Sequence, residues 1–362
     1  MKNKYEIISL FMWAWGLDLW FNEWGFQTIW WNEYDKTIWD TIEYNFPGVE
    51  LDKRSITDIK WNEVPNSIWI IWWPPCQSWS EAWAWRGIND KRWKLFYDYI
   101  RILKEKKPLF FLAENVSGIL ADRHRDAFNG IIKEFSSLWY NVTYNLLNAN
   151  DYWVPQDRNR VIIVWYNKIM GKYFIPPEQQ KYKPTLKDAI FDLRDAKPAL
   201  ERNYANEEKN LSYPNNEYMT WAFSSIYMSR NRVRSWNEPS FTIQAWWRHA
   251  PIHPQAPKMK FVWVNKRIFE PWKEYLYRRL SVRECARIQT FPDSFIFKYK
   301  NIADWYKMVW NAVAVNFAKC LAEQIYSDID IFLKGHLEKT VLNTNSLYKI
   351  TEPNHNISVI NY

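Results

Sequence analysis

The stretch from Ile68 to Ser80 constrains the fold more than any other part of the chain. It reads I-W-I-I-W-W-P-P-C-Q-S-W-S, an apolar run that stops at two prolines, which fix φ and cannot donate to a sheet. This pattern predicts a buried strand followed by a stiff loop whose first side chain is Cys76. At the carboxyl edge of a parallel sheet a cysteine thiolate would be a strong nucleophile. The alternative is a small, buried and inert cysteine.

Strand-like and helix-like segments alternate through the first half of the chain. Strands are expected at residues 7–11, 26–31, 108–113, 142–147 and 161–165. Helices are expected at residues 17–24, 35–45, 95–103 and 125–138. Such alternation is typical of an α/β fold built on a doubly wound, mostly parallel sheet.

The second half of the chain has a different character. From about Lys168 to residue 275 it is rich in proline, asparagine, tyrosine and arginine and shows no sustained helical period, which predicts a smaller, irregular domain. Regularity returns at Ser281, where S-V-R-E forms a capping box. A helix packed on a core is then predicted by apolar residues that recur every three to four positions, at Val313, Phe317, Leu321 and Ile325.

These features divide the chain into three parts. Residues 1–168, completed by residues 311–334, are expected to form the α/β domain. Residues 169–310 are expected to form the irregular domain and a hinge. After Gly335 the sequence is polar and aperiodic, so residues 335–362 are expected to be a tail without stable structure.

Charge and cysteine content exclude several classes of protein. The formal net charge of +8 over 362 residues favours an acidic polymer as partner. The three cysteines, Cys76, Cys285 and Cys320, are scattered and lack metal-ligand spacing, so we expect neither a disulfide scaffold nor a metal site, but a cytoplasmic location. No charge-free run reaches membrane-spanning length, and a signal-peptide cleavage site is not evident. We expect a monomeric protein that neither associates with a membrane nor binds a metal ion.

Three polar groups stand at predicted strand ends or in adjoining loops, namely Glu33, Cys76 and Glu114. Such positions converge at one edge of a parallel sheet, so a nucleophile and two carboxylates are expected to share a cleft. The spacing from Gly16 to Glu33 is close to that at which an acidic residue meets a ribose hydroxyl in dinucleotide-type folds. Taken singly, a carboxylate in such a position is more often a solvated loop residue.

A series of motifs is more specific than any single residue. In chain order it comprises F-M-W-A-W-G (residues 11–16), P-P-C-Q (74–77), E-N-V (114–116), Q-D-R-N-R (156–160), R-R-L-S-V-R-E-C-A-R-I-Q-T-F-P (278–292) and N-A-V (311–313). This series resembles that of the DNA cytosine-5 methyltransferases. The segments P-P-C-Q-S-W-S-E, L-L-N-A-N-D-Y, M-S-R-N-R-V-R and H-P-Q-A-P most resemble the GGCC-specific, HaeIII-type modification enzymes.

The resemblance implies a Rossmann-like, S-adenosylmethionine-dependent fold and a set of catalytic roles. Cys76 would attack C6 of a cytosine, while Glu114 bonds or protonates N3 and so stabilises the adduct. C5 would then accept the methyl group of S-adenosylmethionine. Arg158 and Arg160 match the family's paired arginines, which are expected to fix the base and support its loop.

The resemblance also implies the cofactor site and assigns the first domain to catalysis and cofactor binding. Positions expected to line that site are Phe11, Gly16, Glu33, Tyr34, Ser55, Ile56, Pro75, Leu95, Asn311 and Val313. One departure concerns adenine, because Arg54-Ser55-Ile56 stands where the family usually has Gly-Asp-Ile. Either Asp52 replaces the missing aspartate or that contact is lost.

Duplex DNA is the implied partner, with the irregular domain as target-recognition domain. The cytosine must leave the base stack, and Ser80 and the loop bearing Arg86 and Arg92 match the segment that closes over it. Sequence reading and phosphate contacts are expected from Arg230, Arg232, Arg234 and Arg248. A restriction endonuclease for the same site would be a functional partner. The rival functions are a non-catalytic DNA-binding protein and an RNA cytosine-5 methyltransferase.

The glycine and tryptophan contents are abnormal. The chain has 8 glycines and 26 tryptophans, whereas glycine normally makes up about 7% of residues. The family and the nearest relatives suggest glycine at Trp13, Trp15, Trp20, Trp72, Trp73, Trp93, Trp139, Trp153, Trp165, Trp247, Trp272, Trp305 and Trp310. Our hypothesis is that UGA codons for glycine have been read as tryptophan; deliberate replacement is the alternative. As written, the chain is expected to fold poorly or to fail to bind S-adenosylmethionine.

Overall fold

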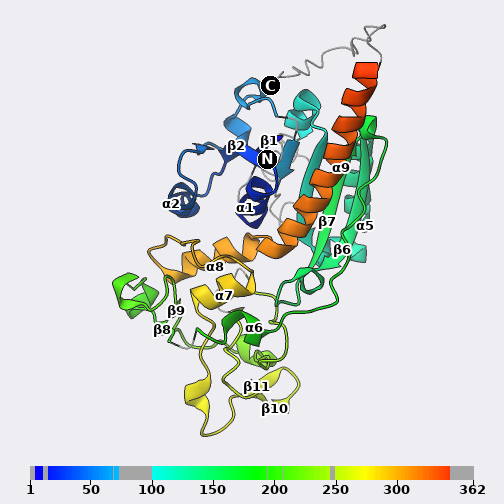
Figure 1. Ribbon diagram of the computed structural model, residues 1–362. Helices are drawn as coiled ribbons and strands as arrows, with labels where there is room; N and C mark the ends of the chain where they lie inside the picture. Colours follow the sequence, from blue (N-terminus) through cyan, green and yellow to red (C-terminus); the bar gives the residue numbers. More distant parts are fainter. Residues whose placement is uncertain are drawn as a thin grey trace.

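The computed structural model describes residues 5–10, 15–67, 69–72, 100–193, 195–206, 208–244 and 249–342. Its largest element is a seven-stranded sheet in the order β3-β2-β1-β4-β5-β7-β6 (Figure 1). The strands are β1 Tyr5–Leu10, β2 Phe26–Asn32, β3 Glu50–Asp52, β4 Trp69–Trp72, β5 Phe110–Val116, β6 Tyr140–Asn148 and β7 Asn159–Asn167. Strands β3, β2, β1, β4 and β5 pair in parallel, whereas β7 runs antiparallel to both β5 and β6. The expected mostly parallel sheet is confirmed.

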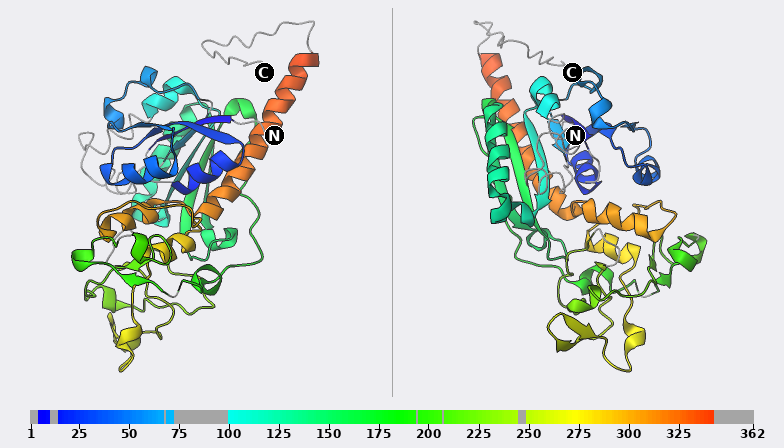
Figure 2. Two further views of the ribbon diagram at one scale, coloured as in Figure 1. Left: turned by 60° about the vertical axis from the view of Figure 1, so that its left-hand side comes forward. Right: turned by 180° about the vertical axis from the view of Figure 1, so that it is seen from behind.

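The sheet is buried on both faces, which explains why its strands read as continuous apolar runs. Alternate residues of β5 point to opposite sides, so Phe110 belongs to one core and Phe111 to the other. The first core lies under α1 (Trp15–Glu23) and α9 (Val315–Leu342), and the second lies under α5 (Arg125–Ser137). Figure 2 shows these helices on the two sides of the sheet.

A third core joins the sheet domain to the irregular region. It contains Ile42 from α2 (Lys36–Asn45), Val282 from α7 (Val282–Ile288) and Trp305 from α8 (Ile302–Asn311). The predicted capping box is confirmed at the start of α7, since the amide of Glu284 donates to Oγ of Ser281 at 3.0 Å and the amide of Ser281 donates to Oε2 of Glu284 at 2.7 Å.

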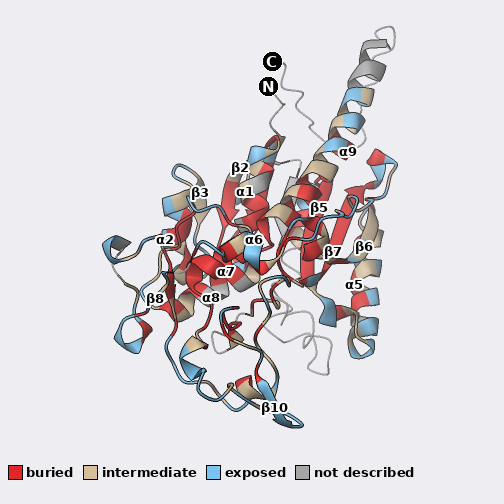
Figure 3. Cartoon of the chain, turned by 60° about the horizontal axis from the view of Figure 1, so that its bottom comes forward, coloured by how far each residue is buried: buried red, intermediate tan, exposed pale blue. Residues whose placement is uncertain are grey.

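The region between β7 and α7 is built from short elements, as its composition predicts. They are α6 Leu186–Ile190, β8 Lys197–Pro198, β9 Glu217–Tyr218, β10 Lys260–Trp263 and β11 Lys266–Ile268. Short 3-10 helices occur at η2 Ile56–Asp58, η3 Trp61–Glu63, η4 Ser117–Leu120, η5 Asp122–His124, η6 Ala149–Tyr152, η7 Lys168–Met170, η8 Glu201–Asn203, η9 Glu208–Asn210, η10 Tyr227–Ser229 and η12 Glu274–Leu276. Burial follows the sheet and α7, whereas β10 lies exposed at the far end of the molecule (Figure 3).

The end of the chain differs from the prediction in two respects. Helix α9 begins at Val315, two residues after the first member of the predicted apolar stripe, and Ala312, with an extended backbone, ends the preceding α8. The expectation that regular structure ends at Gly335 is wrong, since α9 continues to Leu342. One glycine costs a helix only about 1 kcal/mol, and the leucines, lysine and glutamate that follow it are good helix formers. Of the helix expected at residues 95–103, the part from Ile100 onward is described and is helical.

Candidate active site

A buried ion pair lies at the carboxyl end of the parallel part of the sheet. Glu114 lies near the carboxyl end of β5, and the antiparallel β7 starts beside that end, where Arg160 pairs with Val116. Nε of Arg160 lies 2.5 Å from Oε1 of Glu114, and both side chains are almost completely buried. The antiparallel pairing of β5 with β7 therefore brings together two charges that are far apart along the chain.

Burial gives the Glu114 carboxyl unusual acid–base properties. Loss of hydration raises its pKa to about 7, although Arg160 and Arg158 act in the opposite direction. A carboxyl with a pKa near neutrality exchanges its proton under physiological conditions, which suits a general acid or base.

Arg158 connects this carboxylate to another predicted site. It is buried, and its Nη2 donates to the carbonyl oxygen of Ala312 at 3.0 Å. Ala312 lies between Asn311 at the end of α8 and the buried Val313. The E-N-V, Q-D-R-N-R and N-A-V motifs, which are separate in the sequence, therefore meet at one place.

The predicted nucleophile lies outside the described residues. The last described residue before it is Trp72 at the end of β4, which pairs with Leu10 of β1 and with Ala113 of β5. Ala113 immediately precedes Glu114, so the end of β4 lies beside the strand that carries the buried ion pair. Also outside the described residues are Phe11, Pro75, Ser80, Arg86, Arg92, Leu95 and Arg248.

Glu33, just after β2, carries an unsatisfied oxygen that a ligand could use. Its Oε1 accepts from the amide of Asp35 at 2.7 Å, whereas Oε2 is buried without a hydrogen-bond partner among the described residues. Burial raises the pKa of this carboxyl to about 8. An orphaned buried oxygen fits the expected ribose hydroxyl, which would donate to it. The neighbouring Tyr34 is exposed.

Gly16 lies in close contact with the backbone of Val313. A Cβ atom on Gly16 would lie 1.9 Å from the carbonyl oxygen of Val313, so no larger residue fits without a shift of the backbone. This contact brings the start of α1 against the N-A-V motif. The structure thus brings Gly16 and Val313 together, and Asn311 stands two residues before Val313 at the end of α8.

The segment expected to contact adenine, residues 54–56, differs from the family's Gly-Asp-Ile in its polar side chains. Oγ of Ser55 caps η2 by accepting from the amide of Thr57 at 3.4 Å, and Ile56 is buried. The carboxylate of Asp52, the candidate substitute, lies 2.7 Å from Nη2 of Arg54 and is thereby engaged.

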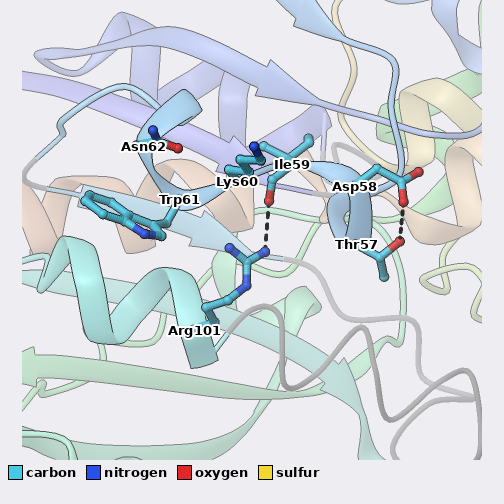
Figure 4. Close-up of a pocket in the computed structure, with 7 residues that line it drawn as sticks. All are labelled: Thr57, Asp58, Ile59, Lys60, Trp61, Asn62 and Arg101. Atoms are coloured by element: carbon cyan, nitrogen blue, oxygen red, sulfur yellow. Dashed lines mark hydrogen bonds between the residues drawn. The ribbon is translucent and has the colours of Figure 1, made fainter.

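A cavity of about 510 Å³ opens directly after this segment (Figure 4). Arg101 reaches across it and donates to the carbonyl oxygen of Ile59 at 2.9 Å. The complete lining is Thr57, Asp58, Ile59, Lys60, Trp61, Asn62 and Arg101. None of the predicted cofactor residues belongs to this set.

The described arginines that the sequence analysis expects to contact DNA differ in their surroundings. Arg230 is exposed. Nε of Arg232 donates to the carbonyl oxygen of Tyr227 at 3.1 Å. Nη2 of Arg234 lies 2.9 Å from Oδ2 of Asp157, a residue of the Q-D-R-N-R motif that the sequence argument did not single out. Its only sequence signal was its place within that motif.

The comparisons decide the family. The model of the C-5 cytosine-specific DNA methylases matches residues 5–327. The chain belongs to this family. The C-5 methylase chain is 53% identical over 325 residues to the type II methyltransferase M.MthTI of Methanothermobacter thermautotrophicus, covering 90% of this chain and 98% of the relative. It is 52% identical over 324 residues to M.FnuDI of Fusobacterium nucleatum, covering 88% and 94%.

Structural comparison agrees on the fold of this C-5 methylase. The Entamoeba histolytica methyltransferase EhMeth superposes with a TM-score of 0.63 at 16% identity, covering 91% of this chain and 99% of the other. The Rossmann-like methyltransferase fold and the DNA (cytosine-5-)-methyltransferase class are therefore confirmed. No helix within the described ranges is long and apolar enough to cross a membrane. In the same ranges no three His, Cys, Asp or Glu side chains gather as a metal site would require.

Proposed function

We propose that this C-5 methylase transfers a methyl group from S-adenosylmethionine to C5 of a flipped cytosine within GGCC in duplex DNA. The observation that carries the proposal is the buried Glu114–Arg160 pair beside the strand that leads to Cys76. The GGCC site rests on the resemblance of P-P-C-Q-S-W-S-E, M-S-R-N-R-V-R and the related segments.

In this proposal Cys76 adds to C6 while Glu114 binds or protonates N3, so that the electrons released by the addition are held on the ring. Loss of the C5 proton and of Cys76 after methyl transfer restores the aromatic base. The raised pKa of Glu114, about 7, supports this role because both protonation states are populated near neutrality. Arg160 orients the Glu114 carboxylate, and Arg158 supports the adjoining cofactor segment.

S-adenosylmethionine, when bound, supplies an electrophilic methyl group. The orphaned Oε2 of Glu33 would accept from the ribose, and Gly16 would allow the backbone to approach the cofactor. Tyr34, Ser55, Ile56, Asn311 and Val313 would complete the described part of the pocket. Phe11, Pro75 and Leu95 would complete the rest.

The proposed domain roles follow the same division of the chain. Residues 1–168 with 311–334 would form the catalytic domain, and residues 169–310 the target-recognition domain with its hinge. We propose a cytoplasmic monomer that protects DNA from a restriction endonuclease of the same specificity. DNA contacts would come from Arg230, Arg232, Arg234 and Arg248, and from the loop with Ser80, Arg86 and Arg92.

We further propose that glycine is the native residue at the suspect tryptophans. Support comes from the backbone, because Trp139, Trp153 and Trp272 have φ angles of 76°, 62° and 67°. A bulky residue rarely adopts this left-handed region, whereas glycine does so freely. All three positions were suspected from sequence alone. The codons test the idea directly, since UGG at Trp139 and Trp272 would contradict it.

The activity is tested with two purified versions of the full chain, one as written and one with glycine at the suspect positions. Each is incubated with duplex DNA and S-adenosylmethionine, and 5-methylcytosine is mapped by bisulfite sequencing. We expect methylation at GGCC by the glycine version alone. Methylation at another site would overturn the specificity, and a folded glycine version without activity would favour the non-catalytic DNA-binding alternative.

A further inference from the structure

The β10–β11 hairpin is a solvent-exposed projection from the recognition region. We call residues 258–268 the hairpin arm. Its two strands pair only with each other and do not join the large sheet. Apolar side chains at its tip are strongly exposed, with Phe261 at 59% and Val264 at 77%. Exposed apolar residues gathered in this way are typical of an interaction surface and not of a free surface.

The arm carries a strong positive charge. It contains Lys258, Lys260, Lys266 and Arg267, and the chain has no acidic residue between Glu238 and Glu270. Lys260 and Lys266 are exposed, and neither forms an ion pair with a carboxylate among the described residues. Lys258 pairs with Glu238 outside the arm, and Lys266 lies over the ring of Trp263 at 4.1 Å from its centroid. Because the arm itself has no carboxylate, its excess of cations complements a phosphate backbone.

The arm is fixed to the segment that bears the recognition arginines. The amide of Met259 donates to Oδ1 of Asn231 at 2.9 Å, next to Arg230. Beyond β11, the ring of Phe269 stacks on that of Tyr277 with centroids 4.2 Å apart. The arm is thus held beside the segment of Arg230 through Met259, and the residue that follows it, Phe269, is packed against Tyr277.

We propose that the hairpin arm binds duplex DNA outside the target site, with Lys260 and Lys266 on phosphates and the apolar tip against a groove. A two-stranded ribbon has dimensions that a DNA groove admits, and apolar wedges are a known means of contact there. A second copy of the chain is a poorer occupant, because self-association would bring two clusters of cations together without an anion. The inference rests on the proposed DNA-binding function but concerns flanking contacts and not the choice of site.

The test compares the full-length glycine version with its Lys260→Gln/Lys266→Gln variant on two duplexes, one barely longer than GGCC and one extended by about a helical turn on each side. On the long duplex we expect weaker binding, by about tenfold at low salt, and a salt slope reduced by about 2, since each phosphate contact contributes about 0.9. Affinity for the short duplex and the methylated site should not change. A Lys133→Gln/Lys168→Gln variant, with the same loss of charge on another face, should behave like the parent.

The inference would be overturned if the variant had the same affinity and the same salt slope as the parent on both duplexes. It would also be overturned if the variant without DNA sedimented differently from the parent, because the arm would then serve self-association. If the parent itself binds neither duplex, the proposed function fails, and this outcome is distinct from failure of the arm.

Discussion

The carbonyl oxygen of Ala312 accepts a hydrogen bond from Nη2 of Arg158 at 3.0 Å. This contact joins the segment after β6 to the turn between α8 and α9. Because Gly16 touches Val313 in the same turn, the proposed catalytic and cofactor groups share one structural support. Substitution of Arg158 should therefore affect cofactor binding as well as catalysis.

Replacing Arg158 by Met should weaken S-adenosylmethionine binding by about tenfold, because a charged hydrogen bond contributes about 1.5–3 kcal/mol and the Ala312 carbonyl would lose its donor. Isothermal titration of the glycine version measures the effect. The control is Arg125→Met, which removes an exposed pair with Asp122 and should change nothing measurable. Equal affinities for parent and Arg158→Met would contradict the shared support.

Glu114→Gln should keep the fold but lower kcat by about 10²–10⁴-fold, the usual contribution of a general acid or base. The amide is close to the carboxyl in size but cannot transfer a proton. In the parent, kcat should fall as pH rises through about 7, where the protonated carboxyl is lost. A variant that retains the parental pH profile would exclude Glu114 as the titrating group.

Glu33 should make the free protein less stable at high pH. Its folded pKa of about 8 lies above the ordinary value of 4.5, so the folded state binds the extra proton. The favourable contribution is present below pH 4.5 and is lost as pH rises through 8, with an upper bound of about 5 kcal/mol at 1.4 kcal/mol per pKa unit.

Glu33→Gln cannot ionise, so it should be more stable than the parent at pH 8 and similar to it at pH 5, while binding S-adenosylmethionine more weakly. Denaturant unfolding at the two pH values gives the difference. The same stability difference at both would show that Glu33 does not titrate in this range.

Trp139→Gly and Trp272→Gly should each stabilise the chain as written by about 1 kcal/mol, because they relieve a left-handed backbone at exposed positions. Trp61→Gly is the matched control. Trp61 is also exposed but is not among the residues of positive φ, so glycine there should destabilise by about 0.5–1 kcal/mol. Destabilisation at all three positions would favour tryptophan as the native residue.

Local patterns predicted much of this structure. Strands β1, β2, β4, β5, β6 and β7, helices α1, α2 and α5, and the capping box at Ser281 follow from apolar patterning and short-range hydrogen bonding, whereas β3 and β8–β11 were not predicted. The convergence of Glu33 and Glu114 on one sheet edge follows from parallel strand direction. The Arg234–Asp157 ion pair and the Arg158–Ala312 hydrogen bond could not be predicted, because each joins segments far apart whose contact depends on tertiary packing.

The central claim is that Cys76 forms a covalent bond to the target cytosine. The most direct test uses duplex GGCC with 5-fluorocytosine at the target position. Fluorine at C5 cannot be removed as the C5 proton is, so Cys76 stays bonded to C6 of the base. With S-adenosylmethionine present, the glycine version should form an adduct that survives denaturing electrophoresis, and Cys76→Ser should form none. An adduct with Cys76→Ser, or methylation of normal DNA by that variant, would contradict the account.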